Sequence, residues 1–235
     1  MTTTIKTPHE RGGTLASSVF DRIRREILSG ELPPGEKLRI EHLRKRYGVG
    51  GSPIREALNR LSVEGMVSRV DQKGFRVADI SVDELDELIK TRCWLEATAV
   101  RESITHGDDA WEEGVVLAFH RLSKAPRSAE AQSFAVNPEW EDLHRAFHMA
   151  VIAGSGSRWL DAYCEQLNDL AERYRQFAIR ASYPQRHELD EHRAIMEAAV
   201  ARDADAAEKV LLDHYRRTGD IIRASFAGMA QPRTR

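Results

Sequence analysis

The chain has 235 residues, of which 41% are hydrophobic and 31% are charged, and its formal net charge is −2. This length allows one large domain or two small ones, with enough apolar side chains to bury a core. No apolar run approaches the roughly 20 residues that span a bilayer, and the first residues lack the apolar segment of a secretion signal. We therefore expect a globular protein of the cytoplasm without a membrane partner.

The two cysteines, Cys93 and Cys164, both lie in stretches with a helical pattern. Two isolated thiols in such surroundings form neither a disulfide framework nor a thiolate metal site. We expect both to be reduced structural residues and assign no function to them.

The charge is distributed unevenly along the chain. Residues 1–78 hold 15 Lys and Arg against 9 Asp and Glu, whereas the remainder holds 20 against 28. A basic N-terminal module is therefore joined to an acidic C-terminal one. This polarity indicates a polyanion partner for the first module. A solvated charged surface explains the same counts, so charge alone leaves both interpretations open.

The N-terminal module begins after residues 1–13, which show no periodic pattern and are expected to form a disordered tail. From residue 15 to residue 29 the apolar residues recur every four positions, which predicts an amphipathic helix. The segment ELPPGEKL then breaks the pattern with two prolines and a glycine. A short second helix follows and ends at Gly48.

A third helix follows a tight turn, with Ser52 as its N-cap and Pro53 in its first helical position, and runs to Gly65. The period then changes, because MVSRV and FRVADI alternate around residues 71–74 as in a two-stranded hairpin. Two helices, a turn, a helix and a hairpin form the order of a winged helix-turn-helix. We assign this fold to residues 14–78, with the third helix as the recognition element.

Arg55 is a candidate for contact with nucleic acid. Counted from the Ser52 cap it is the third residue of its helix, where a cation opposes the helix dipole and an acid is the better choice for stability. A phosphate or base contact explains this choice, and so does an exposed arginine whose stem reaches solvent. Weaker candidates for phosphate contact, each with solvation as the alternative, are Lys45, Arg46, Arg60, Lys73 and Arg76.

The segment GEKLRIEHLRKRYGVGGSPIREALNRLSVEGMV resembles the DNA-binding segment of GntR-type bacterial transcription regulators, and the resemblance covers nearly all of residues 15–78. It implies that Ser52 and Arg55 contact double-stranded DNA and that Gly74 lies in the wing. The family usually has Ser/Thr-Arg-Thr/Ser before the recognition helix, whereas this sequence has Gly50-Gly51-Ser52. Because the arginine is missing, we expect an atypical operator sequence.

The C-terminal module, residues 79–228, has helical periodicity throughout, followed by a tail at 229–235. Ser81 and the acids after it open the first helix. We predict helices at 82–106, 109–124, 138–154, 157–181, 185–202 and 204–228. Residues 125–137 form the one longer loop, and GSGS at 154–157 is a helix-helix turn rather than a phosphate cradle. The predicted fold class is mainly α, a winged helix-turn-helix followed by an all-α bundle of about six helices.

Four histidines of this module lie at suggestive positions, listed as His144, His148, His192 and His214. The first two are four residues apart on one predicted helix and so share a face, and the others lie on two further helices. Such a set can bind a metal inside a bundle, although single histidines in helices are more often packed or exposed. The pattern alone leaves a metal site, a catalytic base and a packed core open.

Two enzymatic interpretations of the stretch HRAFH can be weighed from the residues. A zinc protease needs glutamate after the first histidine as general base, but Arg145 stands there. A di-iron bundle needs two Glu-x-x-His elements, and only Glu141 with His144 forms one. No nucleophile-base constellation can be argued from spacing, so we assign no catalytic residue.

The stretches ELDELIKTRCWLEATAVR, LHRAFHMAVIAGSGSRWL and DEHRAIMEAAVARDADAAEKVLLDHYRR are similar to the FCD effector-binding domain of the FadR-like branch of GntR regulators. The resemblance implies a divalent metal on Asp-x3-His and two later histidines. The matching positions are His144, His148, His192 and His214. His144 replaces the aspartate, so the set is all imidazole. Zinc or nickel suits such ligands, and manganese remains open.

The same resemblance implies a small organic-acid effector that meets Arg92 on the first helix of the domain. A guanidinium grips a carboxylate with two hydrogen bonds, although an ion pair with an acid of this module is the alternative for Arg92. The implied function is a homodimeric repressor of a palindromic operator. A metal-dependent bundle enzyme with an accessory winged domain, or a winged module used for protein contacts, is the alternative.

Overall fold

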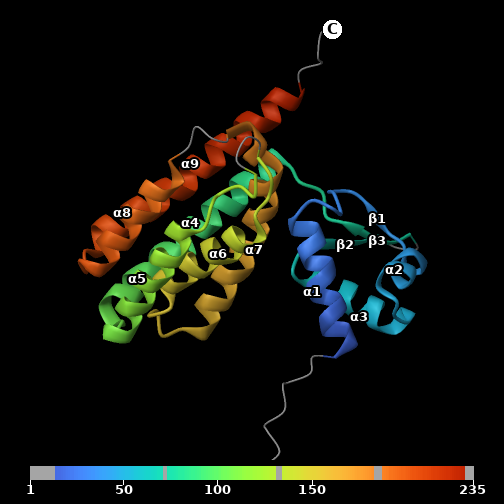
Figure 1. Ribbon diagram of the computed structural model, residues 1–235, viewed down its shortest axis with the longest axis horizontal. Coiled ribbons are helices and arrows are strands. Elements are labelled where there is room, and N and C mark those ends of the chain that lie inside the picture. The colour runs from blue at the N-terminus through green and yellow to red at the C-terminus, as the bar shows by residue number, and fades with distance from the viewer. Residues whose placement is uncertain (1–13, 71–72, 131–133, 183–186, 231–235) are drawn as a thin grey trace, which may run out of the picture. The chain divides into compact units, whose positions relative to one another are not determined.

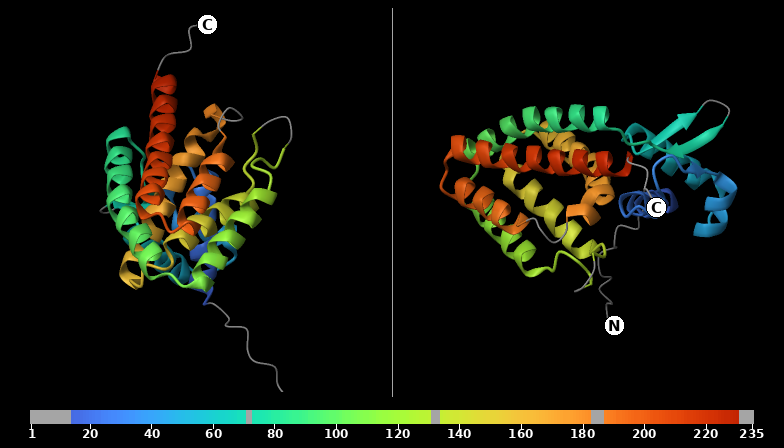
Figure 2. Two further views of the ribbon diagram at one scale, coloured as in Figure 1. Left: turned by 90° about the vertical axis from the view of Figure 1, so that its left-hand side faces the viewer. Right: turned by 90° about the horizontal axis from the view of Figure 1, so that it is seen from above.

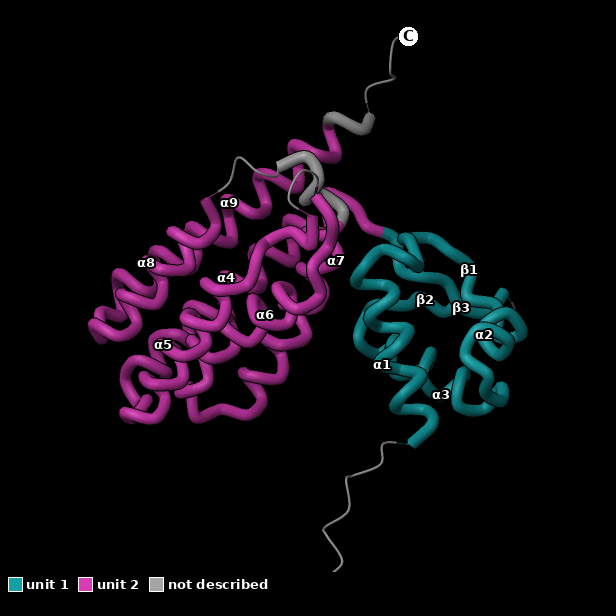
Figure 3. The backbone as a smooth tube through the Cα atoms, viewed as in Figure 1, with its two compact units in different colours: residues 1–79 teal, residues 80–235 magenta. Residues whose placement is uncertain are grey.

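The computed structural model describes residues 14–70, 73–130, 134–182 and 187–230, with the side chains of 177–182 and 228–230 left out. The predicted N-terminal tail, most of the predicted C-terminal tail and half of the predicted hairpin turn lie outside these residues. The chain forms two compact units, residues 1–79 and residues 80–235 (Figure 3). The predicted fold class is confirmed, because the described chain is mainly helical with one small sheet.

Unit 1 consists of three helices and a three-stranded antiparallel sheet (Figure 1). In chain order its elements are α1 (Leu15–Leu28), β1 (Lys37–Leu38), α2 (Ile40–Tyr47), α3 (Gly51–Val63), β2 (Val67–Val70) and β3 (Gly74–Val77). The strand order is β1-β3-β2, so the predicted hairpin forms and gains a third strand. A strand of two residues is too short to show alternation, which is why the sequence pattern missed β1.

The core of unit 1 is the packing of α1 against α3. Ile23 of α1 and Ile54, Leu58 and Leu61 of α3 are fully buried. Their spacing of three or four residues places each set on one helical face, and burying each side chain stabilises the fold by about 1.5–3 kcal/mol. These contacts fix the orientation of the predicted recognition helix within the unit.

The start of α3 differs from the prediction. The helix begins at Gly51 with Gly50 as its N-cap, so the assignment of Ser52 as N-cap is wrong. The physical reason is that the first turn of a helix has unpaired N–H groups, and proline is tolerated throughout that turn. Arg55 is therefore the fifth residue of the helix, beyond its first turn. The helix dipole acts mainly within the first turn, so a cation at this position is not unfavourable for stability.

In the part of the chain that the structure describes, unit 2 is a bundle of six helices. They are α4 (Val82–His106), α5 (Asp109–Lys124), α6 (Pro138–Ile152), α7 (Arg158–Ser182), α8 (Glu188–Val200) and α9 (Ala204–Ala230). All six predicted helices are present, with ends within three residues of the predicted ones, and Ser81 caps α4 as expected. Figure 2 shows α4 and α9 side by side along the bundle, with α8 next to α9.

The predicted helix-helix turn is confirmed between α6 and α7. Its first glycine, Gly154, lies against the end of α4, where an added Cβ would be 2.9 Å from the carbonyl oxygen of Ser103 and 3.1 Å from the Cα of Gly107. Only a residue without a side chain permits this approach. None of the described helices is long and apolar enough to cross a membrane.

We predict that Gly154→Ala destabilises the protein by about 1–3 kcal/mol, because its methyl group would meet backbone atoms that cannot move freely. Gly114→Ala is the matched control, since an added Cβ within α5 meets nothing within 4 Å. The control should be stabilising by about 0.5–1 kcal/mol. Equilibrium urea unfolding measures both, and equal stability of the Gly154 variant and the wild type would refute the close approach.

Candidate nucleic-acid interface and candidate metal centre

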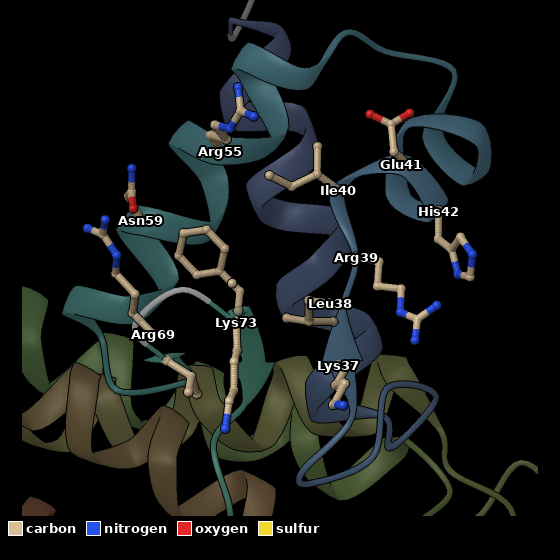
Figure 4. A pocket seen from close by; sticks show the side chains of 13 residues that line it. Lys37, Leu38, Arg39, Ile40, Glu41, His42, Arg55, Asn59, Arg69 and Lys73 are labelled. Carbon is tan, nitrogen blue, oxygen red and sulfur yellow. The ribbon is translucent and has the colours of Figure 1, made fainter.

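A groove of about 990 Å³ crosses unit 1 between α3, the β2–β3 wing and the start of α2. Figure 4 shows Arg55 and Asn59 projecting from α3 and Arg69 and Lys73 from the wing, with Arg39 on the other side. The groove thus joins the predicted recognition helix to the predicted wing, as expected for a surface that receives a duplex.

The lining of the groove is strongly cationic. It contains one acid, Glu41, and five cations, listed as Lys37, Arg39, Arg55, Arg69 and Lys73. Glu41 forms an exposed ion pair with Arg44 at 3.0 Å. A concentration of lysine and arginine in a groove complements the phosphate backbone of a nucleic acid.

Sequence reasoning missed four of the lining residues that carry polar groups, listed as Lys37, Arg39, Asn59 and Arg69. Asn59 lies four residues after Arg55, so the i, i+4 spacing was available as a signal. An asparagine amide can hydrogen-bond the edge of adenine. Lys37 lies in β1 and Arg39 directly follows it, and the pairing of Lys37 with Arg76 holds this segment in the sheet.

Several residues predicted to contact DNA lie outside the groove lining. Ser52 and Lys45 are exposed but are not among the residues that line the groove. Arg46 forms ion pairs with Glu26 at 2.9 Å and Glu31 at 3.2 Å.

Arg60 lies over the ring of Phe20 at 4.1 Å and donates a hydrogen bond to the Ser17 hydroxyl at 3.3 Å. Arg76 lies within β3, and Lys73 and Gly74 line the groove. The φ angle of Gly74 is +86°, which favours glycine at this point of the wing.

The four histidines of unit 2 converge. His144 and His148 come from α6, His192 from α8 and His214 from α9, and all four are at most 6% exposed. One ligand atom from each lies within 4.8 Å of the other three. The Nε2 atoms of His144 and His148 are 3.2 Å apart. The i, i+4 pair and the two histidines on separate helices therefore form one cluster, which agrees with the set that the resemblance implies.

Burial favours the neutral form of the two histidines of α6. Burial lowers the pKa of His144 well below its usual value of 6.5, and the charge of Arg175 and the neighbouring imidazoles lower it further. Burial is also the main cause that lowers the pKa of His148 below its usual value. The nearby His214 and His192 and two arginines lower the pKa of His148 further. A neutral imidazole offers a nitrogen lone pair, which is the form that binds a metal.

The donor set fits a borderline metal ion. Two imidazole nitrogens bound at about 2.0–2.1 Å to a tetrahedral ion lie about 3.3–3.4 Å apart, close to the 3.2 Å between His144 and His148. The widest separation in the cluster is 4.8 Å, so an ion would draw at least one ring inward. Nitrogen-only donors favour zinc or nickel over calcium or magnesium.

Two of the rings are held by outer contacts. The Nδ1 of His214 lies 2.7 Å from a carboxylate oxygen of Glu191, which leaves its Nε2 for the cluster. The Nδ1 of His148 lies 3.2 Å from the hydroxyl of Tyr215. The ring of His144 stacks on Trp140 at 4.6 Å, and its Nδ1 has no hydrogen-bond partner among the described residues.

Arg92 lies in the core of unit 2, 4% exposed. Its Nε donates to Glu96 at 2.8 Å, one of its terminal nitrogens donates to Asn168 at 3.3 Å, and its guanidinium lies 4.0 Å from the centre of the Tyr215 ring. The ion pair weighed as the alternative for Arg92 is therefore present, within α4 itself. An anionic ligand that binds Arg92 would share the guanidinium with the carboxylate of Glu96.

Glu141 is not part of the cluster. Its carboxylate is held between Arg127 at 2.9 Å and Arg175 at 2.5 Å. Although burial opposes the shift, Arg175 and Arg127 hold the pKa of Glu141 below its usual value of 4.5. The Glu-x-x-His interpretation thus lacks its carboxylate ligand, because Glu141 is committed to two arginines.

Comparison with known proteins gives consistent matches for both units. Residues 15–77 match the family described as bacterial regulatory proteins, gntR family, and residues 87–217 match the FCD domain. The chain is 37% identical over 210 residues to the HTH-type transcriptional repressor GlaR of Escherichia coli, covering 88% of this chain and 94% of that protein. It is 35% identical to the HTH-type transcriptional regulator BphR of Paraburkholderia xenovorans, covering 89% and 86%.

Solved structures share the fold. E. coli McbR/YncC matches with a TM-score of 0.75 and 21% identity, covering 92% of this chain and 100% of that one. A GntR transcriptional regulator of a Rhodococcus species matches with a TM-score of 0.73 and 19% identity, covering 90% and 99%. At these identities the likeness concerns the fold alone.

The cationic groove generates a prediction about duplex DNA. Arg69→Ala should weaken binding to duplexes of any sequence and reduce the slope of log affinity against log salt by about one, because one phosphate contact is lost. Lys124→Ala removes the same charge from an exposed position of α5 in unit 2 and is the matched control. Fluorescence anisotropy titrations at several salt concentrations measure the slopes, and equal slopes for the two variants would contradict this use of the groove.

Proposed function

Because the chain belongs to the GntR family of bacterial transcription regulators and carries an FCD domain, we propose that it is a homodimeric repressor controlled by a small organic acid at a metal centre. The family assignment makes the chain a DNA-binding regulator and not an enzyme. The proposal adds the metal, the acid, the dimer and the sign of regulation. One observation carries it, namely the convergence of four buried imidazoles from three helices.

We propose that His144, His148, His192 and His214 bind one divalent ion, zinc or nickel. Burying four imidazoles in an apolar core destabilises the fold unless their nitrogens bind a partner. The contact of Glu191 with His214 is typical of metal-ligating histidines, whose second nitrogen usually donates to a carboxylate or a comparable acceptor. The ion would supply a positive charge and open coordination positions for a ligand.

The charges around the cluster favour an anionic effector. Two carboxylates near it are paired with arginine: Glu96 with Arg92, and Glu191 with Arg217 at 2.8 Å. A dication on histidine ligands would add a positive charge to this buried site. A carboxylate bound to the ion would offset that charge.

Buried hydrogen-bond donors support the same proposal. The Nε of Arg175 and the Nδ2 of Asn168 have no acceptor among the described residues. Asn168 also accepts a hydrogen bond from Arg92. We propose that Arg92 binds the carboxylate of the effector, so the amide of Asn168 lies beside this site. A small acid with more than one oxygen could accept from such donors while it binds the metal.

The DNA-binding proposal combines the groove and a dimer. Arg55 and Asn59 would read base edges, whereas Arg69, Lys73 and Lys37 would contact phosphates. Of the remaining predicted contacts, Ser52, Lys45 and Gly74 keep a backbone or phosphate role, and Arg46 and Arg60 would have to leave their partners within unit 1 to reach DNA.

One recognition helix reads too few bases for useful specificity, so two chains on a palindrome are required. Relatives named as repressors support repression as the outcome. By linkage, an acid that binds one conformation of the dimer better than another changes operator affinity by the same free energy.

Metal content tests the proposal directly. We expect the purified protein to bind about one zinc or nickel ion per chain, and His148→Gln to lose most of this affinity because one of four ligands is removed. His120→Gln is the control, since His120 is exposed on α5 and lies outside the cluster. Elemental analysis after equilibration with each metal gives the stoichiometry. Equal metal content in the two variants would rule out the cluster as the binding site.

A further inference from the structure

The hydroxyl of Tyr215 connects the histidine cluster to the Arg92–Glu96 ion pair. It lies 3.2 Å from the Nδ1 of His148 and also forms a hydrogen bond to a carboxylate oxygen of Glu96. The other oxygen of Glu96 accepts from the Nε of Arg92 at 2.8 Å. All four side chains are buried, at most 4% exposed. One chain of contacts thus runs from an arginine to a candidate metal ligand.

The direction of each hydrogen bond follows from the chemistry of the groups. A carboxylate paired with arginine is an acceptor only, so the Tyr215 hydroxyl donates to Glu96. A phenol keeps its proton at neutral pH, because the ordinary pKa of tyrosine is about 10. Because this proton is donated to Glu96, the phenol oxygen can only accept a hydrogen bond from His148. The Nδ1 of His148 must therefore carry the hydrogen.

This assignment fixes the other nitrogen of the ring. In a neutral imidazole, a hydrogen on Nδ1 leaves a lone pair on Nε2. Nε2 is the atom that faces the Nε2 of His144 at 3.2 Å, inside the cluster. His214 obtains the same arrangement by a shorter route, since its Nδ1 contacts the Glu191 carboxylate directly at 2.7 Å.

We propose that Tyr215 and Glu96 are positioning residues that hold His148 in its Nδ1–H tautomer and so direct its Nε2 to the metal. The inference rests on the metal centre proposed above and adds residues that touch neither metal nor DNA. Glu96 then serves two sites, because it also neutralises Arg92. A ligand anion that draws Arg92 away from Glu96 would leave that carboxylate to the Tyr215–His148 contact, which connects acid binding to metal binding.

The matched pair of variants is Tyr215→Phe and Tyr174→Phe. Each removes one buried phenol hydroxyl that donates to a glutamate in unit 2, and the Tyr174 hydroxyl donates to Glu84 at 2.6 Å, away from the cluster. Loss of an outer-shell partner typically weakens metal binding by about 10–100-fold. We expect that loss in Tyr215→Phe and wild-type zinc affinity in Tyr174→Phe, measured by competition with a chromophoric chelator.

A second measurement does not need the metal. Nitrogen-15 chemical shifts of histidine side chains in the metal-free protein distinguish the two tautomers, and the signal lost in His148→Gln identifies the residue. We expect the Nδ1–H tautomer for His148 in the wild type and in Tyr174→Phe, and a mixture or the opposite tautomer in Tyr215→Phe. This readout responds to the hydrogen bond and not to packing.

The two readouts separate the possible failures. An Nε2–H tautomer in the wild-type protein, or equal zinc affinity in the two phenylalanine variants, overturns the role of Tyr215 and Glu96. A wild-type protein that binds no zinc or nickel overturns the proposed metal centre instead. In that case the tautomer of His148 still decides whether the hydrogen-bonded chain from Arg92 exists.

Discussion

The structure of unit 2 depends on how its core accommodates polar groups. Four imidazoles and several full charges are removed from water there, and each such group destabilises the fold unless it is paired. The arginines and carboxylates near the cluster form complementary pairs, as Arg92 with Glu96 and Glu141 with Arg127 and Arg175 show. The four imidazoles converge on one point. A metal ion is the simplest partner that would satisfy all four together.

The same pairing explains why an acid is a reasonable effector. In the resembling family an aspartate ligand supplies one negative charge, whereas His144 supplies none. The stacking of His144 on Trp140 holds the ring without a hydrogen bond at Nδ1 among the described residues. In our proposal, the charge of a bound ion is offset by an anionic ligand from outside the histidine set. Histidine in place of aspartate would then favour an acidic effector while keeping the site.

The sequence predicted the parts that depend on local periodicity. The six helices of unit 2, the shared face of His144 and His148 and the wing hairpin all follow from spacing of three, four or two residues. Contacts between distant segments were not predictable. Strand β1, the place of Arg69 and Lys37 in the groove and the chain from Glu96 through Tyr215 to His148 arise only when elements far apart in sequence pack together. The predicted start of α3 was wrong, because proline is tolerated at several positions in the first turn of a helix.

The central claim is that the histidine cluster controls DNA binding, and linkage gives its most direct test. The measurement is the affinity of the protein for the DNA that flanks its own gene, with zinc-loaded and metal-free protein and a panel of small carboxylic acids. We predict that at least one acid shifts the affinity of the loaded wild-type protein by about 5-fold or more. The same acid should leave Arg92→Gln/Glu96→Gln unchanged, a double variant that removes the arginine without leaving a buried charge unpaired. Affinities that are identical with and without metal for every acid would contradict the account.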